Sequence, residues 1–223
     1  MKRFKNILVI YDESVGAEDA LNQATMLAEA NAARLKVVDL AEEGRLTFDR
    51  KRERERRLMR MVPAIRTEHM GEVETRLLVG TPFLEVIREV LRGEHDLVIA
   101  SAEGGSVVES VFFGSTVAHL IRKCPCPVWI LKPGQTVPYG RILAAIDPKP
   151  NDPVSMKLNT KIMGLATSLA RASHGKLDIL HVWDVIGKDA DTLSSEIPEQ
   201  TRAAILATHQ EAQKTLIAGF LDQ

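Results

Sequence analysis

Small and acidic residues that could surround a phosphate follow two apolar runs of the chain. The run at 7–11 is followed by Asp12, and the run at 96–100 leads into the loop Ser101-Ala102-Glu103-Gly104-Gly105-Ser106. Gly114-Ser115 then stands at the start of a predicted helix. In an open α/β sheet, ligands bind beyond the carboxyl ends of the strands, where the strand order reverses. Exposed backbone N–H groups and a helix N-terminus attract anions, so this pattern indicates a nucleotide phosphate site.

Each of these residues also has a purely structural interpretation. Asp12 could cap the helix that follows it. Gly104 and Gly105 could serve only a turn, and Gly114-Ser115 could be only a helix start. The prediction of a binding site therefore depends on their combination in one crevice.

The elements that must position these residues alternate between strand and helix. Val-, Ile- and Leu-rich runs without polar alternation are typical of parallel strands buried on both faces; they lie at 7–11, 35–40, 73–79, 96–100 and 127–131. Helical patterns lie between them, at 15–33, 48–65, 82–92 and 114–123. This alternation predicts an α/β fold with an open, doubly wound parallel sheet.

Residues that favour helix ends set the expected limits of the third predicted helix, at 82–92. Thr81 is predicted to be its N-cap, with Pro82 at the first helical position, where the missing N–H is harmless. Gly93 is predicted to occupy the left-handed position that ends the helix.

The chain repeats itself after a predicted linker at 134–139. The strand that ends in Asp12 matches one that ends in Asp147, an offset of 135 residues, and the next strand matches at an offset of 142. We therefore expect one domain at 1–133 and a second copy at 140–223. The second copy is predicted to be incomplete, because it has no counterpart of 72–131 and ends with a helix at about 196–219.

Composition excludes several classes of protein. With 29 Lys and Arg against 30 Asp and Glu, the net charge of −1 gives no overall attraction to nucleic acid or anionic membranes. A hydrophobic content of 45% is that of an ordinary globular protein. No uncharged apolar stretch approaches the roughly 20 residues needed to span a bilayer. We expect a cytoplasmic protein that makes no membrane contact.

Two cysteines flank one proline, in Cys124-Pro125-Cys126. They are too close in the chain for an ordinary structural disulfide. The pair resembles half of a metal site, but zinc needs four ligands and no histidine cluster lies nearby, so no metal is predicted. We expect small buried thiols at a turn, in a reducing compartment.

The segment 49–60 carries seven basic residues and three acidic ones. It could bind nucleic acid or an acidic partner. A solvated helix face with internal ion pairs is the favoured interpretation, because no aromatic side chains interleave for base stacking.

The six histidines show no metalloprotease spacing, and no nucleophile-elbow sequence is present. His181 lies in a predicted strand and is expected to be a satisfied core residue. No catalytic nucleophile or general base is predicted, and hence no enzyme.

Taken together, Asp12 followed by Ser14, the spacing from Gly104 to Gly114-Ser115, and Cys124-Pro-Cys126-Pro-Val resemble the universal stress protein family in its tandem two-domain form. The resemblance covers 4–132 as a whole domain and 140 to about 219 as a partial one. It implies a five-stranded sheet in the order 3-2-1-4-5, of the adenine nucleotide alpha hydrolase-like type, followed by the partial second copy. It also implies a role in stress survival and a homodimer paired through the edge strand 127–131.

Nucleotide-binding members of that family carry Gly-x2-Gly-x9-Gly-Ser/Thr, where this chain has Ser101-x2-Gly104-x9-Gly114-Ser115. The resemblance implies Asp12 at a ribose or metal, Val38 or its neighbour at the adenine, and Gly104, Gly114 and Ser115 at the phosphates. Ser101 adds a side chain where the backbone should be bare. Glu103 adds a negative charge that would cost about 4 kcal/mol at about 4 Å from a phosphate. ATP or another adenine nucleotide is therefore expected to bind weakly or not at all.

The sequence thus predicts a non-enzymatic stress-response protein that acts as a ligand sensor or interaction platform. One alternative is an ATP-binding stress protein with slow ATP hydrolysis. Another is a protein that binds nucleic acid or an acidic partner through the basic helix at 50–60.

Overall fold

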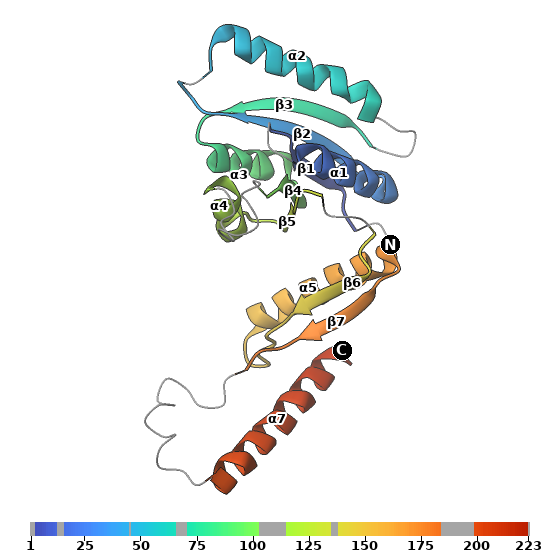
Figure 1. The fold of residues 1–223 in the computed structure, drawn as a ribbon, viewed down its shortest axis with the longest axis vertical. Helices are drawn as coiled ribbons and strands as arrows, with labels where there is room; N and C mark the ends of the chain where they lie inside the picture. Colours follow the sequence, from blue (N-terminus) through green and yellow to red (C-terminus); the bar gives the residue numbers. More distant parts are fainter. Residues whose placement is uncertain are drawn as a thin grey trace. The chain divides into compact units, whose positions relative to one another are not determined.

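The computed structural model describes residues 3–12, 16–44, 46–65, 71–102, 115–134, 138–183 and 199–222. Glu103, Gly104 and Gly114 lie outside these ranges. The chain divides into two compact units, Met1–Gln135 and Thr136–Gln223, which are treated separately below (Figure 1). Within the described ranges, no helix is both long and apolar enough to cross a membrane.

The first unit contains a parallel five-stranded sheet in the order β3-β2-β1-β4-β5, which confirms the predicted topology. Its strands are β1 (Asn6–Ile10), β2 (Arg34–Ala41), β3 (Val73–Val79), β4 (Leu97–Ser101) and β5 (Val128–Leu131). The central strands β1 and β4 are buried along their whole length. This burial explains why their sequences are continuously apolar rather than alternating.

Helices cover both faces of this sheet (Figure 1). They are α1 (Ala17–Asn31), α2 (Phe48–Ile65), α3 (Pro82–Gly93) and α4 (Ser115–Lys123). One face packs on α1 and α2 through Ala24 and Leu58, and the other packs on α3 and α4 through Val86 and Leu120. The alternate side chains of each strand point to opposite faces, so one strand supplies both cores.

The third helix begins as predicted but ends differently. Thr81 stands at the N-cap with Pro82 after it, but the Thr81 side chain makes no capping hydrogen bond. The prediction for Gly93 is wrong: Gly93 is the last helical residue, and Glu94 takes the left-handed conformation at φ 51°. The glycine is needed for space instead, because a Cβ on Gly93 would lie 2.5 Å from Nε2 of His95.

A buried aspartate on β2 holds helix α2 on the sheet. Asp39 is fully buried, and its carboxylate accepts from Arg54 (Nε to Oδ2, 2.7 Å) and from Arg57 (Nη2 to Oδ2, 3.1 Å). Arg54 also donates to the backbone carbonyl of Leu40 at 3.1 Å. The guanidinium group can donate two parallel hydrogen bonds to a carboxylate. These bonds offset the cost of burying the negative charge of Asp39.

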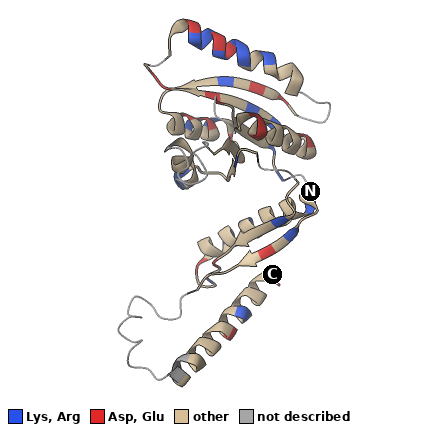
Figure 2. Ribbon diagram, in the orientation of Figure 1, with Lys and Arg blue, Asp and Glu red and all other residues tan. Residues whose placement is uncertain are grey.

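This pairing revises the interpretation of the basic segment. Two of its seven cations, Arg54 and Arg57, turn inward to Asp39 instead of facing solvent. The other basic residues of the segment are exposed, and blue and red ribbon segments alternate along α2 in Figure 2. These exposed residues are Arg50, Lys51, Arg52, Arg56 and Arg60.

A second buried carboxylate, Glu89 of α3, fastens that helix to the other face. Its oxygens lie 2.9 Å from Lys36 of β2, 2.9 Å from Arg76 of β3 and 3.1 Å from Arg92 of α3. Burial alone would raise the pKa of Glu89. The hydrogen bond from Lys36 and the three positive charges outweigh burial and lower the pKa.

The second unit contains a two-stranded parallel sheet with helices. Its elements are β6 (Arg141–Ala145), α5 (Pro153–Ser173), β7 (Lys176–Leu180) and α7 (Glu199–Leu221). Ile142 and Ala144 pack on α5 through Ala166 and Ala170. On the other face of β6, the side chain of Leu143 is 60% exposed.

The strand register agrees with the repeat found in the sequence. In the first unit Ile10 pairs with Val38, and in the second unit Ala145 pairs with Leu180. These pairs are related by the offsets of 135 and 142 residues that the sequence alignment requires. The two units therefore begin with the same strand–helix–strand arrangement.

Replacing the anchor of α2 should weaken the first unit strongly. We expect Asp39→Ala to lower the free energy of unfolding by about 3–5 kcal/mol, because it leaves two arginines facing a site without its carboxylate. Urea titration measures the loss. Glu53→Ala, at an exposed carboxylate of the same helix, is the control and should change stability by less than about 0.5 kcal/mol. Equal small effects of both substitutions would contradict this role of Asp39.

Candidate functional site

The carboxyl edge of the first sheet gathers three of the predicted site residues. The N–H of Tyr11 donates to the carbonyl of Val38 at 2.8 Å, and this bond fixes the position of Asp12, the next residue. Asp12 is half-buried, while the Val38 side chain is fully buried in the core with Ile10. Ser101 ends the neighbouring strand β4.

Ser101 lies beneath the turn that leads into α1. Only 6% of Ser101 is exposed, and its hydroxyl donates to the carbonyl of Ala102 at 3.2 Å. A Cβ on Gly16 would lie 2.5 Å from this hydroxyl oxygen and 3.0 Å from Cγ of Pro133. Gly16 also has φ 99°, which side chains rarely adopt. The Ser101 side chain therefore fills the space between the turn and the sheet.

Ser115 is the first residue of α4, as predicted from the sequence. Gly104 and Gly114, the two glycines expected at the phosphates, belong to the segment that the structure leaves undescribed. The structure thus brings Asp12, Val38 and Ser101 to one sheet edge and begins a helix at Ser115.

A network of polar side chains beside Asp12 was not predicted. The hydroxyl of Tyr11 donates to the carboxylate of Glu18 on α1, and the guanidinium of Arg57 lies 5.7 Å from the centre of the Tyr11 ring. Burial, and then the hydrogen bond to Glu18, raise the pKa of Tyr11 to about 12. Tyr11 is therefore a neutral hydrogen-bond donor at physiological pH. Together with Asp39, these residues connect β1, β2, α1 and α2.

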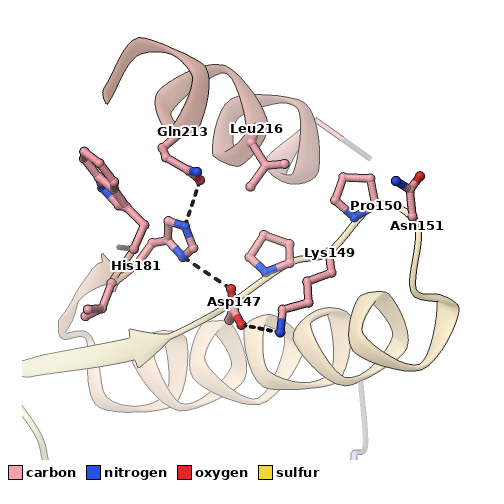
Figure 3. Close-up of a pocket in the computed structure, with 10 residues that line it drawn as sticks. Asp147, Lys149, Pro150, Asn151, His181, Gln213 and Leu216 are labelled. Atoms are coloured by element: carbon pink, nitrogen blue, oxygen red, sulfur yellow. Dashed lines mark hydrogen bonds and ion pairs between the residues drawn. The ribbon is translucent and has the colours of Figure 1, made fainter. Parts of the chain in front are cut away.

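The second unit repeats this edge and contains a cavity there (Figure 3). The N–H of Ile146 donates to the carbonyl of Leu180 at 2.9 Å, as Tyr11 does to Val38. Asp147 follows, at the position that Asp12 holds in the first unit. The residue after Leu180 is His181, at the position that Asp39 holds.

The cavity has a volume of about 450 Å³. The Asp147 carboxylate is 61% exposed and lies 3.2 Å from Nζ of Lys149 and 4.0 Å from Nδ1 of His181. These interactions are drawn in Figure 3. The lining residues are Asp147, Pro148, Lys149, Pro150, Asn151, His181, Val182, Trp183, Gln213 and Leu216.

Helix α5 holds the Asp147 backbone in place. The buried side chain of Asn159 accepts from the N–H of Asp147 at 2.8 Å and donates to its carbonyl at 2.9 Å. The hydroxyl of Ser155 donates to the same carbonyl at 2.9 Å. At the start of the helix, the Asp152 side chain accepts from two backbone N–H groups, which is the geometry of an N-cap. The backbone that carries the exposed Asp147 carboxylate is therefore held firmly in position.

His181 connects the sheet to α7. Its Nδ1 lies 3.0 Å from the carbonyl of Ile146 and its Nε2 lies 3.1 Å from the amide of Gln213. The contact at Nε2 is with the amide oxygen Oε1 of Gln213, so both ring nitrogens face acceptors, and each donates where it carries a proton. His181 is hydrogen-bonded, as predicted, but the prediction of a core residue within a strand is wrong, because His181 follows the end of β7, is half-buried and lines the cavity. The offset of 142 residues, applied to Asp39, would have identified its role as a helix anchor.

The chemistry of this cavity is suited to binding. A carboxylate can hold hydroxyl groups, an ammonium group can hold an anion, and the Trp183 ring can stack on a flat ligand. The ten residues that line the cavity include no serine, cysteine or threonine that His181 could activate. Among the described residues, no three His, Cys, Asp or Glu side chains are close enough together to hold a metal ion.

The chain belongs to the universal stress protein family, whose model matches residues 3–132. It is similar over nearly its whole length to Universal stress protein E of Escherichia coli strain K12, with 28% identity over 242 residues, 99% of this chain and 75% of the relative. A universal stress protein of Thermus aquaticus is 30% identical over 139 residues, which cover 58% of this chain and 99% of that protein.

Solved structures agree on the fold. A putative universal stress protein from Pseudomonas aeruginosa superimposes with a TM-score of 0.68 at 20% identity, covering 98% of this chain and 71% of that one. Universal stress protein UspA from Lactobacillus plantarum gives a TM-score of 0.51 at 20% identity, covering 58% of this chain and 98% of that one.

The contact between Gly16 and Ser101 can be tested by a double-mutant cycle. Gly16→Ala should destabilise the first unit by at least about 1 kcal/mol more than Gly134→Ala, because Gly134 also has positive φ (72°) but open space around it. Ser101→Ala, which removes the hydroxyl, should reduce this difference. Chemical denaturation of the wild type, of Gly16→Ala, of Ser101→Ala and of the double variant gives the coupling energy; strictly additive losses would contradict the contact.

Proposed function

We propose that the protein is a non-enzymatic stress-response protein that acts as a ligand sensor or interaction platform. The observation that carries the proposal is the cavity at the carboxyl edge of β6 and β7, where Asp147, Lys149 and Trp183 surround an open space. The Asp147 backbone is held by two side chains of α5, Asn159 and Ser155. Family membership supports the stress-response role and the proposed cytoplasmic location.

The ligand that fits this chemistry is an adenine nucleotide or nucleoside. A ribose offers hydroxyl groups to the Asp147 carboxylate, a phosphate suits the Lys149 ammonium, and a base offers a flat face to Trp183. The cavity's volume of about 450 Å³ lies within the usual range for small-molecule sites, about 300–1,000 Å³.

The first unit supports a second candidate, an ATP-binding stress protein with slow hydrolysis. The observation in its favour is the arrival of Asp12 and Ser101 at one sheet edge. Ser101 is buried, so its hydroxyl does not face the place where a nucleotide phosphate would lie. Weak ATP binding in the first unit would therefore depend on Gly104 and Gly114. The nucleic-acid alternative is weakened because Arg54 and Arg57 pair with Asp39.

We also propose a homodimer paired through β5. This strand lies at one edge of the first sheet, and its residues Val128, Trp129 and Ile130 are only half-buried. An edge strand of this composition is a natural template for pairing with another chain.

Ligand binding can be followed by the fluorescence of Trp183 in a Trp129→Phe background. Titration with ATP, AMP and adenosine should change the emission, and Asp147→Asn should weaken binding at least tenfold, a loss of about 1.4 kcal/mol. Asp12→Asn, at the equivalent aspartate of the first unit, is the matched control and should leave this signal unchanged. Unaltered affinity in Asp147→Asn would contradict the proposed site. Loss of ATP binding only in Asp12→Asn would favour the first unit instead.

Pairing through β5 predicts a dimer in light scattering. Trp129→Lys places a charge on the edge strand and should shift the protein to monomer without unfolding it, which circular dichroism verifies. A monomeric wild-type protein at high concentration would contradict the dimer.

A further inference from the structure

The two cysteines form a pair of adjacent thiols at the surface of the first unit. Cys124 follows the last residue of α4, Cys126 stands two residues before β5, and their sulfur atoms lie 3.6 Å apart. Neither is in a disulfide, and both are half-buried. The thiols lie at a turn, as predicted, but they are half-buried and not buried, because the turn around Pro125 lies at the border of the core.

The turn is fixed at both ends while its thiols stay near solvent. The N–H of Cys124 donates to the carbonyl of Leu120 at 2.9 Å, which continues the hydrogen bonding of α4. The N–H of Val98 donates to the carbonyl of Pro127 at 3.0 Å, which ties the other end to β4. One side of each cysteine packs on the core face that contains Leu120. The two sulfur atoms are therefore held together by the fold and do not meet by chance.

The Cys124 thiol ionises more readily than an ordinary cysteine. A hydrogen bond from the Cys126 thiol lowers the pKa of Cys124 to about 7; burial opposes this shift and the backbone N–H of Cys126 adds to it. A substantial fraction of Cys124 is then thiolate at neutral pH, and the thiolate is the form that attacks disulfides. Cys126 is within reach to complete the exchange.

We propose that Cys124 and Cys126 form a redox-active dithiol that a low-molecular-weight disulfide, such as glutathione disulfide, converts to an intramolecular bridge. The Cys124 thiolate attacks one sulfur of the reagent, whose disulfide bond breaks, and one glutathione thiolate leaves and takes up a proton. The Cys126 sulfur, after losing its proton, then attacks the Cys124 sulfur of the mixed disulfide. A second glutathione leaves. The protein loses two electrons and two protons, and the reagent is reduced to two thiols.

The resulting bridge should be easy to reduce. A disulfide bond is about 2.05 Å long, so the sulfur atoms must approach from 3.6 Å across a loop of one intervening residue. Exposed disulfides have the more oxidising potentials, and a cross-link that closes so short a loop adds little stability to the fold. The pair is therefore suited to reversible oxidation and not to permanent stabilisation.

Intact-protein mass spectrometry tests the proposal on the folded wild-type chain. After treatment with excess glutathione disulfide at neutral pH, we expect a mass lower by two hydrogen atoms, reversed by dithiothreitol. Cys126→Ala keeps the attacking thiol but lacks the resolving one, so it should accumulate a mixed disulfide that carries one glutathione. Cys124→Ala should react at least tenfold more slowly, because its remaining thiol lacks the favourable hydrogen bond.

Two results would contradict the redox-active dithiol. A wild-type chain that keeps one or two bound glutathiones, or that does not react while folded but reacts after denaturation, overturns the proposal. A pH titration of iodoacetamide alkylation gives an independent check. The reaction of Cys124 should be half-maximal near pH 7 in the wild type and should move to higher pH in Cys126→Ala. An unchanged midpoint would remove the role assigned to Cys126.

Discussion

The buried pairing of Asp39 with Arg54 and Arg57 is the constraint on which the carboxyl edge of the first unit depends. A fully buried carboxylate without its partners would be strongly destabilising, so α2 must keep both arginines directed at β2. That requirement places Arg57 over Tyr11, and Tyr11 in turn is bonded to Glu18 at the start of α1. These contacts, together with the backbone bond from Tyr11 to Val38, hold the residue next to Asp12 in place.

The second unit uses the same backbone geometry with different side chains. Ile146 and Leu180 repeat the bond between Tyr11 and Val38, but His181 replaces the charged anchor and binds one amide of α7. At the described residues of this edge, the first unit carries arginine and tyrosine side chains, and the second unit has a cavity. Duplication has thus preserved the strand register while the side chains beyond the strands have diverged.

Sequence reasoning predicted the elements and the sheet order because buried parallel strands leave continuous apolar runs such as Ile7-Leu8-Val9-Ile10, and the resemblance supplied the order. It failed where the role of a residue depends on contact with a side chain elsewhere in the chain. Gly93 makes room for the His95 ring, Ser101 fills the space beside Gly16, and Arg54 pairs with Asp39 across fifteen residues. None of these contacts produces a hydrophobic periodicity or a sequence motif that could be recognised in advance. The cavity beside Asp147 was missed for the same reason, since Gln213 joins it from a helix far along the chain.

Helix α7 forms one wall of the cavity, through Gln213 and Leu216. The hydrogen bond between His181 and Gln213 links this helix to the end of β7 and contributes about 0.5–1.5 kcal/mol. Most of the described side chains of α7 are exposed, and Phe220 is buried. The shape of the cavity therefore depends on how α7 is held. A ligand that contacts both Asp147 and α7 would hold the helix more firmly against the sheet. Ligand binding would then reduce the motion of all twenty-three residues of α7, which form part of the surface.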